Sequence, residues 1–246
     1  MGNVKPELVM LETPGFHNND LEVGRSRMLK NGSWKKQRII MIIPAGQYIS
    51  TKVYLSHSSI AFPPNNAVVR IAACGMEVGE AYDNAVSGIL ADPNLSQFEY
   101  IFTVEHDNLI NPDCVINLLE KMENHPEFAA ISALYWTKGM SGCPQIWGDV
   151  NDPVLNFRPQ PPDVNGGLVE CNGIGMGAAL WRISMFKDTG LRRPFFKTQT
   201  KGGVSTQDLY FCGNARSRGF RFAVDCSSKV GHWDEEGSFG LEQFAW

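Results

Sequence analysis

Three short polar segments contain the residue types that could carry out chemistry. The first is Glu105-His106-Asp107, which directly follows the apolar run at 100–104. Two carboxylates separated by one residue at the end of a strand can hold a hard divalent cation through their oxygens. Ligands of open α/β sheets collect at the carboxyl ends of the strands, where this triplet would lie. A strand that ends in solvated charges explains the same residues, and the triplet alone favours that simpler interpretation.

The second segment, Thr206-Gln207-Asp208, lies at the start of a predicted helix. Thr206 can cap this helix, and the helix dipole stabilises an acidic residue in the first turn. Capping and the dipole therefore account for Asp208 as a structural residue. The functional alternative is a carboxylate that points into a cleft and acts as a general base.

The third segment is Gly231-His232-Trp233, just after a short apolar stretch. A single histidine beside an aromatic residue is more often packed or hydrogen-bonded than a ligand. None of the three segments is decisive alone, so the elements that position them must be considered together.

The apolar pattern predicts an α/β fold that begins at residue 38. Runs of a strand's length alternate with stretches in which apolar residues recur at helical spacing, as in a largely parallel sheet. The expected strands are 39–43, 67–73, 100–104 and 128–135, and the helices after the second and third runs are 78–90 and 112–122. Further along, helices are expected at 177–187 and 207–217 and a strand at 221–224. The Gly- and Pro-rich stretch at 136–162 predicts a functional loop or lid.

Composition excludes several classes of protein. The 246 residues include 22 Lys plus Arg and 26 Asp plus Glu, a formal net charge of −4, so a nucleic-acid binder is not expected. The six cysteines are scattered without a C-x-x-C pair, which predicts reduced, mostly buried thiols. No apolar stretch is long enough for a signal peptide or a membrane span, so we expect a cytoplasmic protein without an integral membrane segment.

Taken in order, the segments resemble the GT-A fold glycosyltransferases and are most similar to the family-two enzymes, which use nucleotide sugars. The resemblance covers residues 38–233. Its strongest part is 202–232, where the chain reads T-Q-D-L-Y-F-C-x-x-A-R-x-x-G-F, then a strand and Gly231-His232. It implies an α/β fold with a Rossmann-like, open, mostly parallel sheet flanked by helices. The GT-A-like domain would be 38–246, with 1–37 as an N-terminal extension of uncertain structure.

The family's D-x-D motif falls on Glu105-His106-Asp107, with Glu in place of the first Asp. The resemblance implies that Glu105 and Asp107 bind Mn²⁺ or Mg²⁺ on the diphosphate of the donor. It also implies that His232 supplies a further metal ligand and that His106 faces the ribose or solvent. The family's E-D motif makes Asp208 the catalytic base of an inverting enzyme, although a Gln replaces the acid before it.

Other matching positions imply contacts with the donor and acceptor. Pro44 and Ala45, at the end of the first strand, would lie beside the nucleotide base and ribose. Asn84 is the match to an A-R-N motif that reads Tyr-Asp-Asn in this chain. Gly175 and Gly177 would line the donor-sugar and acceptor side.

These roles describe a metal-dependent glycosyltransferase that moves a sugar from a nucleoside-diphosphate sugar to a hydroxyl of a glycan or small-molecule acceptor. Inversion is favoured because Asp208 matches the base of inverting members. The altered motifs leave open a catalytically silent GT-A domain that binds a sugar nucleotide or glycan. A sugar-phosphate nucleotidyltransferase is a third possibility, disfavoured because Pro44-Ala45-Gly46 replaces the Gly-rich phosphate loop with its Lys or Arg.

Overall fold

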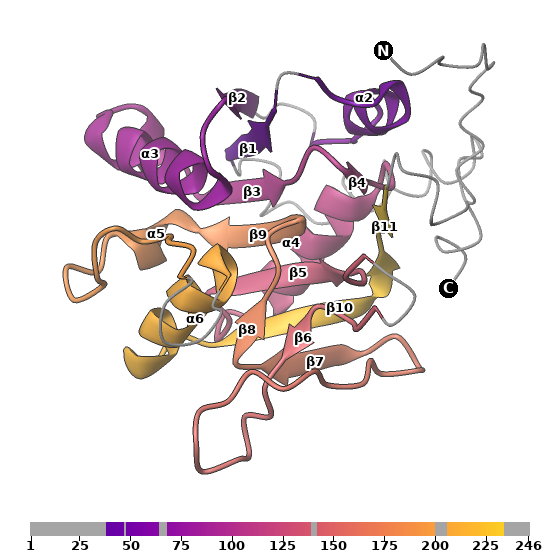
Figure 1. Cartoon of the computed structure of the whole chain (residues 1–246), viewed down its shortest axis with the longest axis vertical. Helices are drawn as coiled ribbons and strands as arrows, with labels where there is room; N and C mark the ends of the chain where they lie inside the picture. The colour runs from indigo at the N-terminus through magenta and orange to yellow at the C-terminus, as the bar shows by residue number, and fades with distance from the viewer. Residues whose placement is uncertain (1–37, 47, 64–67, 139–141, 200–205, 234–246) are drawn as a thin grey trace.

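The computed structural model describes residues 38–46, 48–63, 68–138, 142–199 and 206–233 (Figure 1). The predicted extension at 1–37 lies outside the described residues. A seven-stranded sheet forms the centre, in the order β2 (Val68–Cys74), β1 (Ile39–Ala45), β3 (Tyr100–Val104), β9 (Ala178–Arg182), β5 (Ala130–Leu134), β10 (Phe222–Lys229) and β7 (Leu168–Cys171). Strands β9 and β7 run antiparallel to their neighbours, and the other pairs are parallel. The predicted open, mostly parallel sheet is therefore confirmed.

Helices cover both faces of the sheet, so its strands are apolar on both sides. The β1 side chains Ile40 and Ile42 belong to the core cluster formed with α3 (Val78–Ala91) and α6 (Gln207–Ser217). Their neighbours Ile39 and Met41 belong to the cluster on the opposite face, under α4 (Cys114–Asn124). All four side chains are fully buried, which explains the continuous apolar run. Shorter helices are α2 (Thr51–Ser58), the 3₁₀ helix η2 (Leu95–Gln97) and α5 (Ile183–Phe186).

The helix predicted at 177–187 is wrong in its first half, because residues 178–182 form strand β9, and only the short helix α5 at 183–186 is helical. Strand β9 lies between β3 and β5, and the single short turn α5 follows it. Trp181 Nε1–H donates to Thr103 Oγ1 at 2.9 Å and ties β9 to β3. A strand buried on both faces lacks the alternation that identifies strands, so its short apolar run resembles a buried helix.

Two small sheets connect distant parts of the chain. Strand β6 (Ile146–Trp147) pairs with β8 (Gly173–Ile174), so the Gly- and Pro-rich stretch is joined to the segment before β9. Strand β4 (Asn108–Leu109) pairs with β11 (Gly231–His232). The cysteines are free, and four of the six are buried, as predicted. Within the described ranges, no helix has the length and apolar character needed to cross a membrane.

Candidate active site

The β4–β11 pair brings Asp107 and His232 together. His232 lies opposite Asn108 in this antiparallel pair. Trp233 N–H donates to the Asp107 carbonyl oxygen at 2.6 Å, and His232 Nε2 lies 3.5 Å from Asp107 Oδ2. The first and third predicted segments are far apart in the sequence, and they meet beyond the end of β3, where β11 pairs with β4 (Figure 1).

The other ring nitrogen of His232 sets its orientation. Nδ1 lies 2.7 Å from the carbonyl oxygen of Trp136, which can only accept a hydrogen bond, so we assign the proton to Nδ1. Nε2 then faces Asp107 with a lone pair when the ring is neutral and with a proton when the ring is charged. A neutral ring whose Nδ1–H is held by a carbonyl is the form in which histidine usually ligates a metal.

The two oxygens of the Asp107 carboxylate differ in their contacts with the described residues. Oδ2 lies 2.7 Å from Lys138 Nζ, in addition to its contact with His232. Oδ1 is buried and has no hydrogen-bond partner among the described residues. Burial favours the protonated form, but the hydrogen bonds and charges of His232 and Lys138 outweigh it and hold the pKa of Asp107 well below its usual range. Asp107 is therefore ionised at neutral pH.

Glu105, two residues earlier, has the opposite environment. Burial, followed by the negative charges of Asp107 and Asp208, raises the pKa of Glu105 to about 8, while the charge of Lys138 opposes this shift. At neutral pH the triplet thus contains one ionised and one protonated carboxyl group. A cation bound beside these carboxyls would favour ionisation of Glu105.

Glu105 is expected to make the stability of the ligand-free protein depend on pH. Its carboxyl titrates near 4.5 in the unfolded chain and at about 8 in the folded protein. Between these values the folded state binds more protons than the unfolded state, so Glu105 lowers the free energy of unfolding as pH rises. The variant Glu105→Gln cannot ionise and should therefore gain stability relative to the wild type between pH values of about 5 and about 8. Urea unfolding of both proteins at both pH values measures this gain. The prediction would be contradicted if the variant and the wild type differed in free energy of unfolding by the same amount at both pH values.

Asp208 is positioned by the first turn of α6. Thr206 is the N-cap residue of this helix, as predicted, and Leu209 N–H donates to Asp208 Oδ1 at 2.8 Å. Asp208 is only 7% exposed, and burial raises its pKa, although hydrogen bonds from Thr206 and Leu209 oppose the shift. Because the charge of Asp208 also raises the pKa of Glu105, the two carboxyls share one electrostatic environment. The second predicted segment therefore lies close enough to the first for the charge of Asp208 to act on Glu105.

Two buried tyrosines beside these carboxyls were not found by sequence analysis. Burial raises the pKa values of Tyr82 and Tyr135, and the charges of the three neighbouring carboxylates raise them further. Gly177 N–H donates to the Tyr135 hydroxyl oxygen at 2.8 Å. A Cβ atom at Gly175 would overlap that hydroxyl, and one at Gly177 would overlap the side chain of Asn108. This close packing explains both glycines structurally, and their contact with a substrate stays a prediction.

Pro44 and Ala45 lie at the same edge of the sheet. The pairing of β1 with β3 ends at Ile42 opposite Thr103, so Pro44 and Glu105 each follow two residues later. Gly75 N–H donates to the Ala45 carbonyl oxygen at 3.2 Å, which brings the end of β2 to this edge. The side chain of His106 is exposed. The nucleotide contacts of these residues stay predictions.

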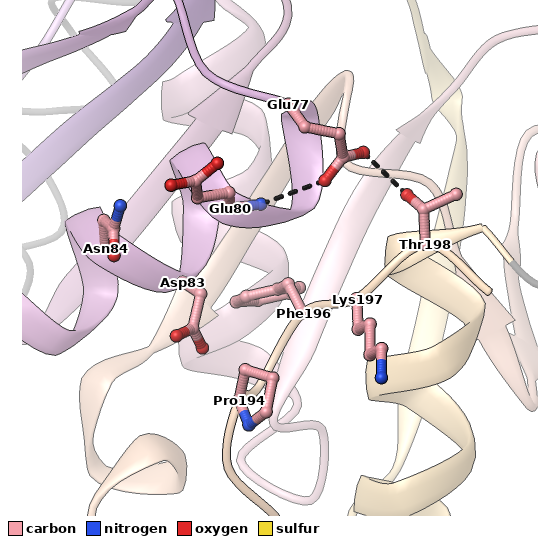
Figure 2. A pocket seen from close by; sticks show the side chains of 8 residues that line it. All are labelled: Glu77, Glu80, Asp83, Asn84, Pro194, Phe196, Lys197 and Thr198. Atoms are coloured by element: carbon pink, nitrogen blue, oxygen red, sulfur yellow. Dashed lines mark hydrogen bonds between the residues drawn. The ribbon is translucent and has the colours of Figure 1, made fainter.

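Asn84 lies on the exposed side of α3, and its Nδ2 is 3.3 Å from Met76 Sδ. It lines a pocket of about 500 Å³ with Glu77, Glu80, Asp83, Pro194, Phe196, Lys197 and Thr198 (Figure 2). Three carboxylates and one ammonium disfavour a diphosphate in this pocket. Tyr82, on the same helix, is close enough to Glu105 for the charge of Glu105 to raise its pKa. Asn84 lies on the exposed side of this helix, and its nucleotide contact stays a prediction.

The described residues contain no group of three or more His, Cys, Asp or Glu side chains arranged to hold a metal ion. The chemistry of the donors nevertheless fits a divalent cation. Among the described residues, the buried carboxylate oxygen Asp107 Oδ1 has no partner, and Glu105 is held protonated partly by like charge. His232 Nε2 points toward the same carboxylate. Lys138 is the further charged group at this position, and no motif in the sequence indicates it.

Comparison with known proteins defines the fold. No protein-family model and no curated protein matches the sequence. The chain is similar to A197 from STIV, with a TM-score of 0.57 and 15% identity over 81% of this chain and 87% of that chain. It is also similar to GalNAc-T7, solved with UDP, GalNAc and Mn²⁺, with a TM-score of 0.54 and 9% identity. That match covers 83% of this chain and 44% of GalNAc-T7. The fold is GT-A-like, and its similarity to a GalNAc transferase is structural.

Proposed function

We propose that the protein is a glycosyltransferase that moves a sugar from a nucleoside-diphosphate sugar to an acceptor hydroxyl. The observation that carries this proposal is the contact between Asp107 and His232 beside the carboxyl end of β3 in a GT-A-like fold, with Glu105 and Asp208 within electrostatic reach of each other. The four residues come from three separate segments. The similarity to GalNAc-T7, solved with UDP and Mn²⁺, supports a nucleotide sugar as the donor.

Asp208 is the general base of the proposed reaction. Sugar transfer passes through an oxocarbenium-like state, and the acceptor hydroxyl must lose its proton as the new bond forms. Burial raises the pKa of Asp208, which brings the carboxylate closer to the working pH and makes it a stronger base. A base on the acceptor side favours inversion at the anomeric carbon.

Asp107, Glu105 and His232 are the residues we propose to hold a divalent cation, Mn²⁺ or Mg²⁺. Such a cation would neutralise charge on the diphosphate that leaves. In the ligand-free protein, Asp107 is already ionised and has an oxygen that no described residue contacts by a hydrogen bond, whereas Glu105 must lose a proton before it can ligate. Cation binding through Glu105 should therefore release a proton near neutral pH.

Thermal unfolding with UDP, GDP, CDP, dTDP or ADP, each with Mn²⁺ or with EDTA, tests the function. A ligand at ~100 times its dissociation constant adds about 2.7 kcal/mol, enough to raise the midpoint by several degrees. We expect one nucleotide to give the largest shift and Mn²⁺ to increase that shift. A protein that no nucleotide stabilises under either condition would contradict the proposal.

A catalytically silent domain that binds a sugar nucleotide is the second candidate. The observation that favours it is the ion pair between Lys138 and Asp107, because it engages a carboxylate that an active enzyme needs. The two functions differ in turnover. Release of nucleoside diphosphate from a bound donor, with transfer to an acceptor or to water, would exclude the silent domain, whereas stable binding without release would support it.

A further inference from the structure

The Lys138–Asp107 ion pair joins a partly exposed ammonium to a mostly buried carboxylate. The Lys138 side chain is 37% exposed and that of Asp107 is 22% exposed. Solvent screens part of the attraction at the lysine end of this pair, and the long side chain loses freedom when it is held in place. The pair also leaves Asp107 Oδ1 buried without a partner in the described part of the chain, which costs stability. A ligand that enters from solvent can therefore reach the ammonium of Lys138.

Lys138 lies beside Asp107, where the proposed mechanism requires the negative charge of the donor diphosphate to be neutralised. Its ammonium lies 2.7 Å from the carboxylate that we propose as a cation ligand, and its charge lowers the pKa values of both Glu105 and Asp107. A second basic residue is close by, since Lys52 Nζ lies 4.4 Å from the centre of the Trp233 ring. Trp233 in turn donates its N–H to the Asp107 carbonyl oxygen. Lys138 therefore places a positive charge against Asp107 before any ligand binds, and Lys52 lies over the ring of Trp233, the residue after His232.

The ligand-free site is also less acidic than its composition suggests. Lys138 balances the charge of Asp107, since its ammonium lies 2.7 Å from Asp107 Oδ2. An ammonium on a flexible four-carbon stem can leave a carboxylate for a phosphate oxygen within its reach. The half-exposed side chain is free to make this movement, because the described residues give it no hydrogen bond besides the one to Asp107 Oδ2.

We infer that Lys138 is a donor-binding residue, whose ammonium leaves Asp107 and contacts the diphosphate of the nucleotide. This inference rests on the proposed function. It predicts that removal of Lys138 weakens diphosphate binding and strengthens the binding of a divalent cation. The diphosphate gains a contact that needs no divalent cation, so nucleotide binding persists in EDTA. Lys138 also competes with a divalent cation for Asp107, so its removal should strengthen cation binding.

The experiment compares Lys138→Met, Lys138→Arg and the exposed control Lys187→Met. Calorimetry measures the affinity for the nucleoside diphosphate selected by thermal unfolding, and for the matching monophosphate, in EDTA. Calorimetry with Mn²⁺ alone, without nucleotide, measures cation binding. We expect Lys138→Met to bind the diphosphate about tenfold to a hundredfold more weakly in EDTA, as for loss of one charge-assisted hydrogen bond, and to bind Mn²⁺ about tenfold more tightly. Lys138→Arg should keep most of the diphosphate affinity, and Lys187→Met should match the wild type.

The two readouts separate this role from a merely structural one. If Lys138 only positioned Asp107, Lys138→Met would weaken Mn²⁺ binding, and that result would overturn the inference. Diphosphate binding by the wild type that requires Mn²⁺ would also overturn it while leaving the proposed function intact. Equal diphosphate affinity of the wild type and Lys138→Met in EDTA would likewise overturn the inference and leave the proposed function intact. If no nucleotide binds with Mn²⁺ or in EDTA, the inference and the proposed function fail together.

Discussion

Replacement of Asp208 by Asn should reduce sugar transfer by ~10²–10⁴, the usual loss when a general base is removed. Asn has nearly the same shape as Asp and can still accept the Leu209 N–H bond, so the start of α6 should stay intact. It cannot take up a proton from the acceptor. The rate of nucleoside-diphosphate release in the presence of acceptor measures the effect.

The nucleotide affinity of Asp208→Asn is the control for this prediction. Asp208 is placed on the acceptor side in the proposed mechanism, so the nucleotide-dependent rise in unfolding midpoint should match that of the wild type. Transfer at the wild-type rate would exclude Asp208 as the base. Loss of nucleotide binding together with transfer would mean that Asp208 supports the structure of the site.

Replacement of Asp107 by Asn should reduce transfer by ~10²–10³, the usual loss when preorganised charge stabilisation is removed. Unlike the change at Asp208, it should also abolish the part of nucleotide binding that depends on Mn²⁺. The reason is that Asp107 is the ionised carboxylate of the triplet and has a buried oxygen without a hydrogen-bond partner in the described part of the chain. Thermal unfolding with the selected nucleotide, with Mn²⁺ and with EDTA, measures this loss.

Nucleotide binding in EDTA distinguishes the role of the Asp107 carboxylate from that of the Lys138 ammonium. Asp107→Asn removes the anionic partner of Lys138, so binding without metal should be retained or strengthened. Asp113→Asn, a change of the same kind at the N-cap of α4, serves as the control and should behave as the wild type. An Asp107→Asn protein that keeps its Mn²⁺-dependent shift would refute the proposed cation site.

The sequence predicted those features that depend on local patterns. The alternation of strands and helices and the helix after Thr206 were confirmed, because periodicity and helix signals are properties of neighbouring residues. Strand β9 was missed because an apolar run buried on both faces has no period that separates strand from helix. The triplet Glu105-His106-Asp107 was placed correctly at the end of β3 for the same local reason.

The tertiary structure alone decided which residues share a site and which charges they carry. Lys138 and Tyr135 follow strand β5, and nothing near them in the sequence indicates that they lie beside Asp107 and Gly177. The opposite pKa shifts of Glu105 and Asp107 depend on burial and on partners from β11 and from the residues after β5. The sequence determines the residue types and the order of the helices and strands. The proximity of the site residues and the burial of their carboxyl groups arise only when distant segments pack together.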